Sequence, residues 1–417
     1  VEGRAPGRLR GGGRPAVFRA AAAPDLEAGG CPHRMADLDA EGFLHTESGR
    51  KVPRLDPTPS LFIDRTIAIY GPSKTGKTVI TKHIMKMVEG HIEQIIIVAP
   101  TEPSNRAYEG FVDPPFIHYR LYLADPANPK KDDGAKGGLR FLEAVWKRQE
   151  MMAAIYTRAN NAEVLAQLYG RLPKPARLEG LRHIELINQK RGRVVERVQR
   201  QYAGEAGRRE EKVKDVNGKF RKMLVLLYKK YIAPSYQELW ARDDLSEDER
   251  YSLYYLNFNP RLLLIFDDCA AQLKPFFNKD IFRLLFYQNR HSFITVIVNC
   301  QDDTDLPTNL RKNAFVSFFT EQIVCNSNFE RPSNKFPKQT KAYVEEISTD
   351  VFREGFRKLA FIREDDRRQH FYHVEFPYPK PFRFGSVASH ELCDAVQSVG
   401  VSMDKENPFY SSFAIAL

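Results

Sequence analysis

Cysteine is scarce in this chain, and its spacing argues against two kinds of small stabilised domain. Of 417 residues only five are cysteine, and no two of them form a C-x-x-C pair. A zinc ribbon needs such paired thiolates, and a disulfide scaffold needs a much higher cysteine content. The sequence therefore disfavours both, and it favours a reducing, intracellular compartment.

Long apolar runs are also missing. Residues 262–266 are among the longest, whereas a membrane-spanning helix needs roughly 18 consecutive apolar residues. We therefore expect no membrane span. Hydrophobic residues still make up 42% of the chain, which is enough for a core in one large or two ordinary domains.

Acidic residues are outnumbered, and the imbalance lies in one segment. The formal net charge of the chain is +10, and residues 169–232 alone hold 18 Lys and Arg against 7 Asp and Glu. Such a basic block favours a polyanionic partner, most simply nucleic acid. The alternative is a solvated helical face rich in Lys and Arg.

The N-terminal segment has little that predicts a fold. Residues 1–30 are rich in Gly, Ala, Pro and Arg, a composition typical of disordered or non-native sequence. We assign residues 1–60 to this segment, expect ordered structure from about Ser60, and take Met35 as the expected start. An Arg-rich transit peptide is the alternative interpretation.

One motif dominates the remainder of the sequence. It fits the P-loop pattern G-x-x-x-x-G-K-[ST], and its residues are Gly71, Pro72, Ser73, Lys74, Thr75, Gly76, Lys77 and Thr78. A strand-like run at 67–70 precedes it and a helical segment at 77–89 follows it, as the motif requires. Backbone N–H groups and the helix N-terminus would hold the phosphates of ATP, Lys77 would reach the β and γ phosphates, and Thr78 would hold Mg²⁺.

The order of predicted elements indicates an α/β protein. The P-loop strand and helix lead to a strand at 95–99, and strands at 262–266, 295–298 and 314–319 follow later. Such alternation is typical of a mostly parallel sheet covered by helices. Residues 124–258 show helical rather than strand patterns, so we predict a helical, basic insertion there. A β-hairpin is expected at 358–362 and 370–376, and a single ATPase domain at 61–417.

Two carboxylates follow the buried strand at 262–266. In open α/β sheets the carboxyl ends of the strands form the ligand site, so Asp267 and Asp268 are expected beside the P-loop. We predict that Asp267 holds Mg²⁺ and that Asp268 polarises the attacking water. An Asp-Asp turn without a catalytic role is the alternative.

Two further side chains are candidates for the reaction. Gln301 follows the strand at 295–298 and would sense the γ phosphate or the attacking water. Arg311 would neutralise charge that develops on the transferred phosphoryl group, in cis or across a subunit interface. For each, an ordinary surface residue is the alternative.

Taken in order, these residues resemble a known family. The succession comprises the P-loop, Ala99-Pro100-Thr101 with Asn105 and Tyr108, Asp267-Asp268, Asn289-Arg290-His291, Gln301, and Leu310-Arg311 with Asn313. It resembles the genome-packaging ATPases of large nucleocytoplasmic DNA viruses, the poxvirus-like branch of the FtsK–HerA superfamily. The resemblance covers roughly residues 61–377, and its most specific part runs from Arg290-His291 through Gln301 to Arg311.

The resemblance implies a RecA-like motor that assembles as a homo-oligomeric ring and drives double-stranded viral DNA into a capsid. It implies ATP and Mg²⁺ as cofactors, and DNA and a capsid or portal-type protein as partners. The expected location is the viral factory in the host cytoplasm, or the virion. Many cellular relatives of this family have Glu where Asp268 stands, so the water-activating carboxylate would be one methylene shorter here.

Other functions stay open on the sequence alone. A P-loop helicase or recombination ATPase is one alternative, although a second RecA-like repeat and separate helicase motifs are missing from the sequence. A nucleotide-switched structural protein without motor activity is another, and a small-molecule kinase would leave the basic insertion unexplained.

Overall fold

The computed structural model describes residues 38–39, 41–125, 127–128, 132–363 and 369–398. Its strands are β1 (Leu44–His45), β2 (Lys51–Val52), β3 (Thr66–Tyr70), β4 (Gln94–Val98), β5 (Ile117–His118), β6 (Leu262–Asp267), β7 (Ile294–Cys300), β8 (Val316–Phe319), β9 (Arg357–Arg363) and β10 (Gln369–Glu375). Its α-helices are α1 (Pro59–Phe62), α2 (Lys77–Val88), α3 (Glu102–Asn105), α4 (Ala135–Ala159), α5 (Ala162–Gly170), α6 (Lys174–Gln201), α7 (Ala206–Ile232), α8 (Tyr236–Trp240), α9 (Glu247–Tyr254), α10 (Ala270–Leu273), α11 (Asp280–Tyr287), α12 (Thr308–Asn313), α13 (Gln322–Glu330), α14 (Lys338–Val351) and α15 (Val387–Ser398).

An eight-stranded sheet organises the larger part of the chain. Its strand order is β10-β9-β8-β3-β7-β6-β4-β5, and the six strands from β8 to β5 are parallel. The antiparallel hairpin β9–β10 extends the edge beside β8. The predicted α/β class, mostly parallel sheet and C-terminal hairpin are therefore confirmed; the predicted turn at 364–368 lies outside the described residues.

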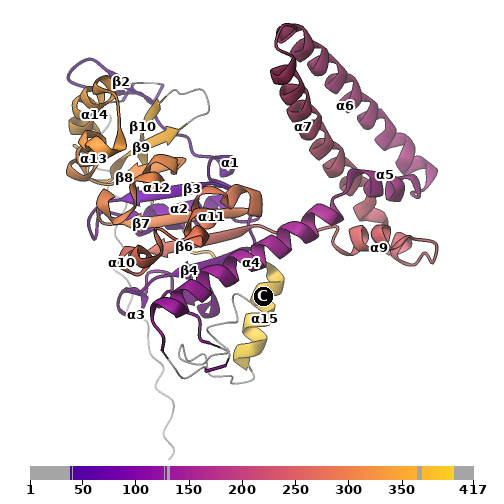
Figure 1. The fold of residues 1–417 in the computed structure, drawn as a ribbon, viewed down its shortest axis with the longest axis horizontal. Helices are drawn as coiled ribbons and strands as arrows, with labels where there is room; N and C mark the ends of the chain where they lie inside the picture. The colour runs from indigo at the N-terminus through magenta and orange to yellow at the C-terminus, as the bar shows by residue number, and fades with distance from the viewer. Residues whose placement is uncertain (1–37, 40, 126, 129–131, 364–368, 399–417) are drawn as a thin grey trace, which may run out of the picture.

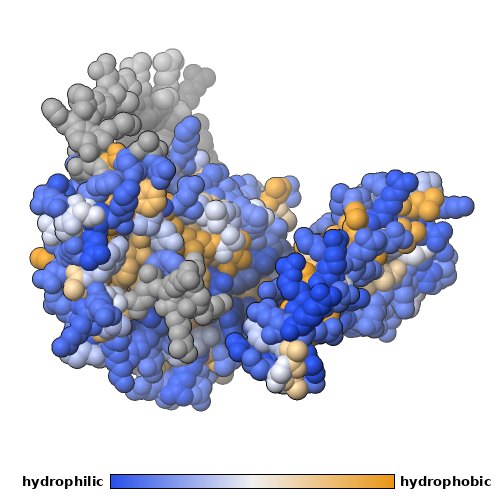
Figure 2. Space-filling view, turned by 90° about the horizontal axis from the view of Figure 1, so that it is seen from above, coloured by the Kyte–Doolittle hydropathy of each residue, from blue (hydrophilic) through white to orange (hydrophobic). Residues whose placement is uncertain are grey.

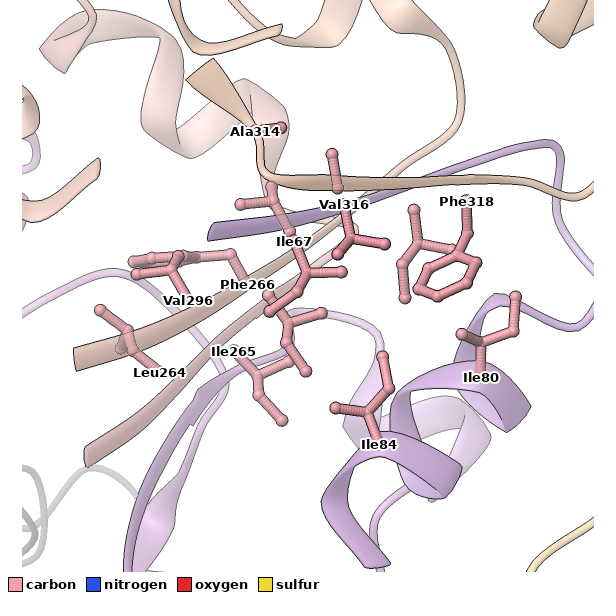
Figure 3. Packing of buried hydrophobic residues seen from close by; sticks show 14 of the residues in the cluster. Ile67, Ile80, Ile84, Leu264, Ile265, Phe266, Val296, Ala314, Val316 and Phe318 are labelled. Atoms are coloured by element: carbon pink, nitrogen blue, oxygen red, sulfur yellow. The ribbon is translucent and has the colours of Figure 1, made fainter. Parts of the chain in front are cut away.

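The sheet is buried on both faces, which explains why its central strands are mostly apolar. Every residue of β3, β6 and β7 is buried. Helix α2 packs Ile80 and Ile84 against the sheet beside Ile265 and Phe318 (Figure 3). Burial of a side chain of this size contributes roughly 1.5–3 kcal/mol, so this layer fixes the P-loop helix firmly on the sheet.

Ordered structure begins earlier than the predicted boundary at Ser60. Residues 44–52 form a small β1–β2 hairpin, and Leu44, Val52 and Leu55 are buried in the main core. The segment after β2 also pairs with the outer edge of β10, because Leu55 N donates to His373 O and His373 N donates to Pro53 O. The short hairpin was missed because two-residue strands carry almost no periodic signal. Residues 1–37, including Cys31 and the expected start Met35, lie outside the described residues.

The predicted insertion at 124–258 consists of two parts with different roles. The first half of α4 belongs to the sheet domain, since Phe141, Leu142 and Val145 are fully buried in its core. The helices α5 to α9 form a second hydrophobic cluster of their own, which includes Leu165, Leu168, Ile232 and Leu253. Helix α4 ends before Asn160, and Asn161 caps α5 by accepting from Glu163 N.

The long helices α6 and α7 form an antiparallel arm that projects away from the sheet (Figure 1). Helix α4 leads from beneath the sheet to the base of the arm, where Arg158 pairs with Glu247 and Asp248. From Leu181 to Lys219, all of it described, no residue is buried. The arm is therefore anchored at its base, and its outer part contains no buried residue.

Two further observations concern the helices and the cysteines among the described residues. None of the helices among them combines the length and apolarity that crossing a bilayer requires. Cys269, Cys300, Cys325 and Cys393 are all free and buried.

Candidate active site

The predicted P-loop connects β3 to α2. Gly76 is the N-cap of α2 with φ +97°, and no side chain caps the helix. The first N–H groups of α2 therefore lack a side-chain acceptor, and the helix dipole adds partial positive charge there. This end of the helix is built to bind an anion.

Lys77 folds back over the loop. Its Nζ donates to Gly71 O at 2.7 Å and to Pro72 O at 3.1 Å, and the side chain is 6% exposed. Ser73 and Lys74 are exposed. The ammonium is thus held inside the curve of the loop, where the phosphates of a nucleotide would lie.

Thr320, which follows β8, supports the P-loop through hydrogen bonds of its hydroxyl group. Its Oγ1 lies 2.6 Å from Thr75 Oγ1, and it also donates to Tyr70 O. A Cβ on Gly71, which has φ +151°, would lie 1.7 Å from Thr320 Oγ1. Only glycine fits at position 71, which explains the first glycine of the motif in this fold.

Asp267 ends β6 in a closely packed polar environment. It is 4% exposed, and its two carboxylate oxygens accept from Tyr108 OH at 2.7 Å and Asn299 Nδ2 at 2.9 Å. Burial raises the pKa of Asp267, and these two hydrogen bonds oppose the rise. Each oxygen keeps a lone pair for a further ligand, so the carboxylate is oriented without being saturated.

Asp268 is the least satisfied group of the site. Its φ is +50°, and its buried Oδ1 has no hydrogen-bond partner. The same oxygen lies 3.8 Å from Lys77 Nζ. A buried carboxylate oxygen without a donor is costly, and left-handed backbone at a non-glycine residue is typical of functional sites.

The sequence did not predict the two side chains that hydrogen-bond to Asp267 and hold it in position. Tyr108 was noted only as part of the family pattern, and its position is fixed because Glu102 accepts from the backbone N–H of Tyr108. Asn299 directly follows the strand predicted at 295–298 and has no predicted role, yet it is fully buried and links Asp267 to Thr81. A polar residue inside the apolar run of β7 was the available signal for Asn299.

Gln301 lies at the carboxyl end of the sheet, but its side chain is exposed. Its backbone N–H donates to Asp305 Oδ2 at 2.9 Å. The polar group that reaches Asp267 from this strand is Asn299, two residues earlier. In this structure the predicted sensor role therefore has a better-placed candidate in Asn299 than in Gln301.

Arg311 is not available as the arginine finger that we predicted. Its side chain is 7% exposed, and it donates to Asp303 O, Asn334 Oδ1 and Thr308 Oγ1. It also lies 3.5 Å from the fully buried carboxylate of Asp303. Local sequence pattern does not predict these hydrogen bonds, because their acceptors come from residues between 3 and 23 positions away from Arg311.

We expect Arg311→Ala to destabilise the fold by about 2–3 kcal/mol, because several buried acceptors would lose their donor while Arg331 still pairs with Asp303. Thermal or urea unfolding measures this. The neighbouring Lys312→Ala is the matched control and should change stability by less than about 0.5 kcal/mol. If Arg311→Ala left stability unchanged but stopped hydrolysis, the finger role would be restored.

The residues present fit Mg²⁺-bound ATP. An uncapped helix N-terminus and Lys77 match the phosphates, and Oδ1 of Asp268, which accepts no hydrogen bond, matches a water or metal ligand. The Thr78 hydroxyl makes no hydrogen bond to any residue that the structure describes. Mg²⁺ is usually held by one or two carboxylates together with substrate phosphates, so Thr78 and Asp267 would hold it here. When bound, the ion would offset the charge of the phosphates.

The parallel sheet, the P-loop at the end of β3 and the two carboxylates at the end of β6 together define a P-loop NTPase fold. No family model matches the sequence. The chain is 52% identical over 372 residues to the uncharacterized protein B354L of African swine fever virus. The alignment covers 89% of this chain and 99% of that protein, and the values are the same for the Tick/Malawi isolate and the Badajoz 1971 strain. The chain therefore belongs to the B354L family.

Two solved structures share weaker similarity. The genome packaging NTPase B204 from Sulfolobus turreted icosahedral virus 2, in complex with ATP-gammaS, is 11% identical with a TM-score of 0.31, covering 76% of this chain and 98% of that chain. VirB4 of Thermoanaerobacter pseudethanolicus is 12% identical with a TM-score of 0.34, covering 84% and 99%. At these values neither structure determines what this chain does.

Proposed function

We propose that this chain is an ATP-hydrolysing motor that moves double-stranded viral DNA into capsids. The observation that carries the ATPase part is the Asp268 carboxylate, whose Oδ1 has no hydrogen-bond donor and lies 3.8 Å from Lys77 Nζ at the open N-terminus of α2. Lys77 and the N–H groups of α2 would bind the phosphates. Asp268 would orient the attacking water and accept its proton, and Asp267 would be held in place for Mg²⁺ by Tyr108 and Asn299.

The basic arm supports the DNA part of the proposal. Helices α6 and α7 hold 17 Lys and Arg against 6 Asp and Glu. Among the described residues only Arg200, Arg208 and Arg221 of these pair with a carboxylate. Figure 2 shows a predominantly hydrophilic arm surface, with scattered hydrophobic side chains. An exposed, unneutralised basic surface of this kind suits sequence-independent contact with DNA phosphates.

The remaining parts of the proposal come from the family resemblance and from membership of a viral family. They are a homo-oligomeric ring, a capsid or portal-type partner and the packaging direction. These parts are separable from the ATPase activity, which the site supports by itself.

The test is ATP hydrolysis by the full chain, with and without linear double-stranded DNA, at low and high salt. Strong stimulation by DNA that is lost at high salt is the expected result. Hydrolysis that is indifferent to DNA would overturn the DNA part and leave an ATPase with another partner. Unwinding that depends on a free end would favour a helicase, and no hydrolysis at all would favour a nucleotide-switched structural protein.

Neutralising the arm should weaken DNA binding without affecting the active site. We expect the triple variant Arg191→Gln, Arg193→Gln, Arg197→Gln to lower the dependence of log affinity on log salt by about 3, roughly 1 for each lost phosphate contact. DNA binding by fluorescence anisotropy across a salt series measures this. The control is a second triple variant with the same charge loss, Arg283→Gln, Lys335→Gln, Lys338→Gln. These three residues lie on the sheet domain. Equal effects of the two triples would show that net charge rather than the arm matters.

A further inference from the structure

Lys358, at the start of β9, is a buried cation that the proposed mechanism does not use. Strand β8 runs parallel to β3, and Phe319 at its end pairs with Tyr70 just before the P-loop. Strand β9 runs antiparallel to β8 and places Leu359 opposite Phe319. The first residues of β9 therefore lie at the same edge of the sheet as the P-loop.

The ammonium of Lys358 is buried and hydrogen-bonded only to carbonyl groups among the residues that the structure describes. The residue is 6% exposed, and its Nζ donates to Gly355 O at 2.7 Å and Thr320 O at 3.5 Å. Within the described residues no carboxylate lies within ion-pair distance of it. Burial lowers the pKa of this ammonium, because two neutral carbonyls replace water poorly as a solvent for a full charge. A nearby anion would remove that penalty.

The P-loop is the nearest place where such an anion would bind. Cε of Lys358 lies 3.9 Å from the position that a Cβ would take on Gly76. Thr320, whose carbonyl Lys358 contacts, also binds Thr75 of the loop through its hydroxyl. Lys358 thus lies beside the glycine that opens α2 and contacts the carbonyl of the threonine that supports the loop.

The charges of the site also indicate that a further cation is needed beside the phosphates. Lys77 supplies one positive charge, whereas Asp267 and Asp268 supply two negative ones. ATP bound with Mg²⁺ remains an anion, so the site as described so far lacks positive charge. Arg311 does not supply it, because its donors are committed to Asp303, Asn334 and Thr308.

We propose that Lys358 is a second phosphate-binding lysine, contributed in cis from β9, that contacts the terminal phosphate of ATP. This inference rests on the proposed ATPase function. Because the γ phosphate is the group present in ATP and missing in ADP, Lys358 would favour ATP over ADP and would stabilise the charge that develops during hydrolysis. It would also connect the occupancy of the nucleotide site to the C-terminal hairpin.

The test compares ATP and ADP binding by Lys358→Gln, which keeps an N–H donor for the two carbonyls but removes the charge. Titration with fluorescent non-hydrolysable ATP and with fluorescent ADP should show ATP affinity at least 10-fold weaker and ADP affinity within about twofold of the wild type. Turnover should fall at least 30-fold, and Lys358→Arg should recover part of it.

Lys82→Gln is the matched control, because Lys82 is also a buried lysine but contacts Tyr378 OH and the ring of Phe111 instead of the P-loop. It should lower the melting temperature without altering the ratio of ATP to ADP affinity.

Three outcomes would overturn the inference. Lys358 would be a structural residue if Lys358→Gln lost ATP and ADP affinity equally. The same conclusion would follow if the variant had a lower melting temperature with an unchanged ratio of ATP to ADP affinity, or if it behaved like the wild type. If Lys358→Gln does not fold, the ratio in Lys358→Arg decides, and an unchanged ratio there overturns the inference. A wild type that neither binds nor hydrolyses ATP would instead overturn the proposed function itself.

Discussion

Replacing Lys77 with alanine should reduce ATP hydrolysis at least 100-fold and weaken ATP binding. Lys77 is the one cation enclosed by the P-loop among the described residues, with its Nζ held by the carbonyls of Gly71 and Pro72. Removing a single preorganised electrostatic contact to a transition state typically costs about 2.7–4 kcal/mol, which corresponds to a factor of roughly 10²–10³. Steady-state hydrolysis and nucleotide titration measure the two effects.

Lys86→Ala is the matched control for this experiment. Lys86 lies on the same helix, is half exposed and pairs with Glu89. Its replacement should leave hydrolysis within about twofold of the wild type. Substantial turnover by Lys77→Ala would contradict the assignment of the P-loop, whatever the control shows.

Asp268→Asn should stop turnover while leaving nucleotide binding nearly intact. The amide has the same shape but cannot accept a proton from water, and general-base catalysis typically contributes a factor of about 10²–10⁴. Because Oδ1 of Asp268 has no donor in this structure, the substitution removes no hydrogen bond from the fold. We therefore expect an unchanged melting temperature, wild-type ATP affinity within a few fold, and a fall in turnover of at least 100-fold.

The control is Asp280→Asn, an almost fully exposed carboxylate at the start of α11. It should leave turnover unchanged. If Asp268→Asn instead abolished binding of Mg²⁺-ATP, the roles of the two carboxylates would be exchanged, with Asp268 at the metal. The comparison thus distinguishes a water-activating from a metal-binding aspartate.

Local sequence patterns predicted the sheet well because each central strand is buried on both faces. The runs at 67–70 and 262–266 are apolar throughout and the run at 295–298 is apolar after Thr295, and β3, β6 and β7 lie within one or two residues of them. The same logic failed for β1 and β2, which are too short to show a period. The sequence prediction also began the insertion too early, since the first half of α4 packs in the sheet domain. The helical pattern of α4 would be the same whether its apolar face packed on the sheet or on another helix.

The sequence by itself determined the P-loop, the strand with Asp267 and Asp268, and the basic segment, because each depends on neighbouring residues along the chain. Only the tertiary structure decided which side chains surround them. Tyr108 reaches Asp267 from the loop after α3 and Asn299 reaches it from β7, across sequence separations of 159 and 32 residues. Arg311 becomes a buried structural residue, and Lys358 comes beside Gly76, because chain order sets neither the packing of α12 nor the antiparallel return of β9.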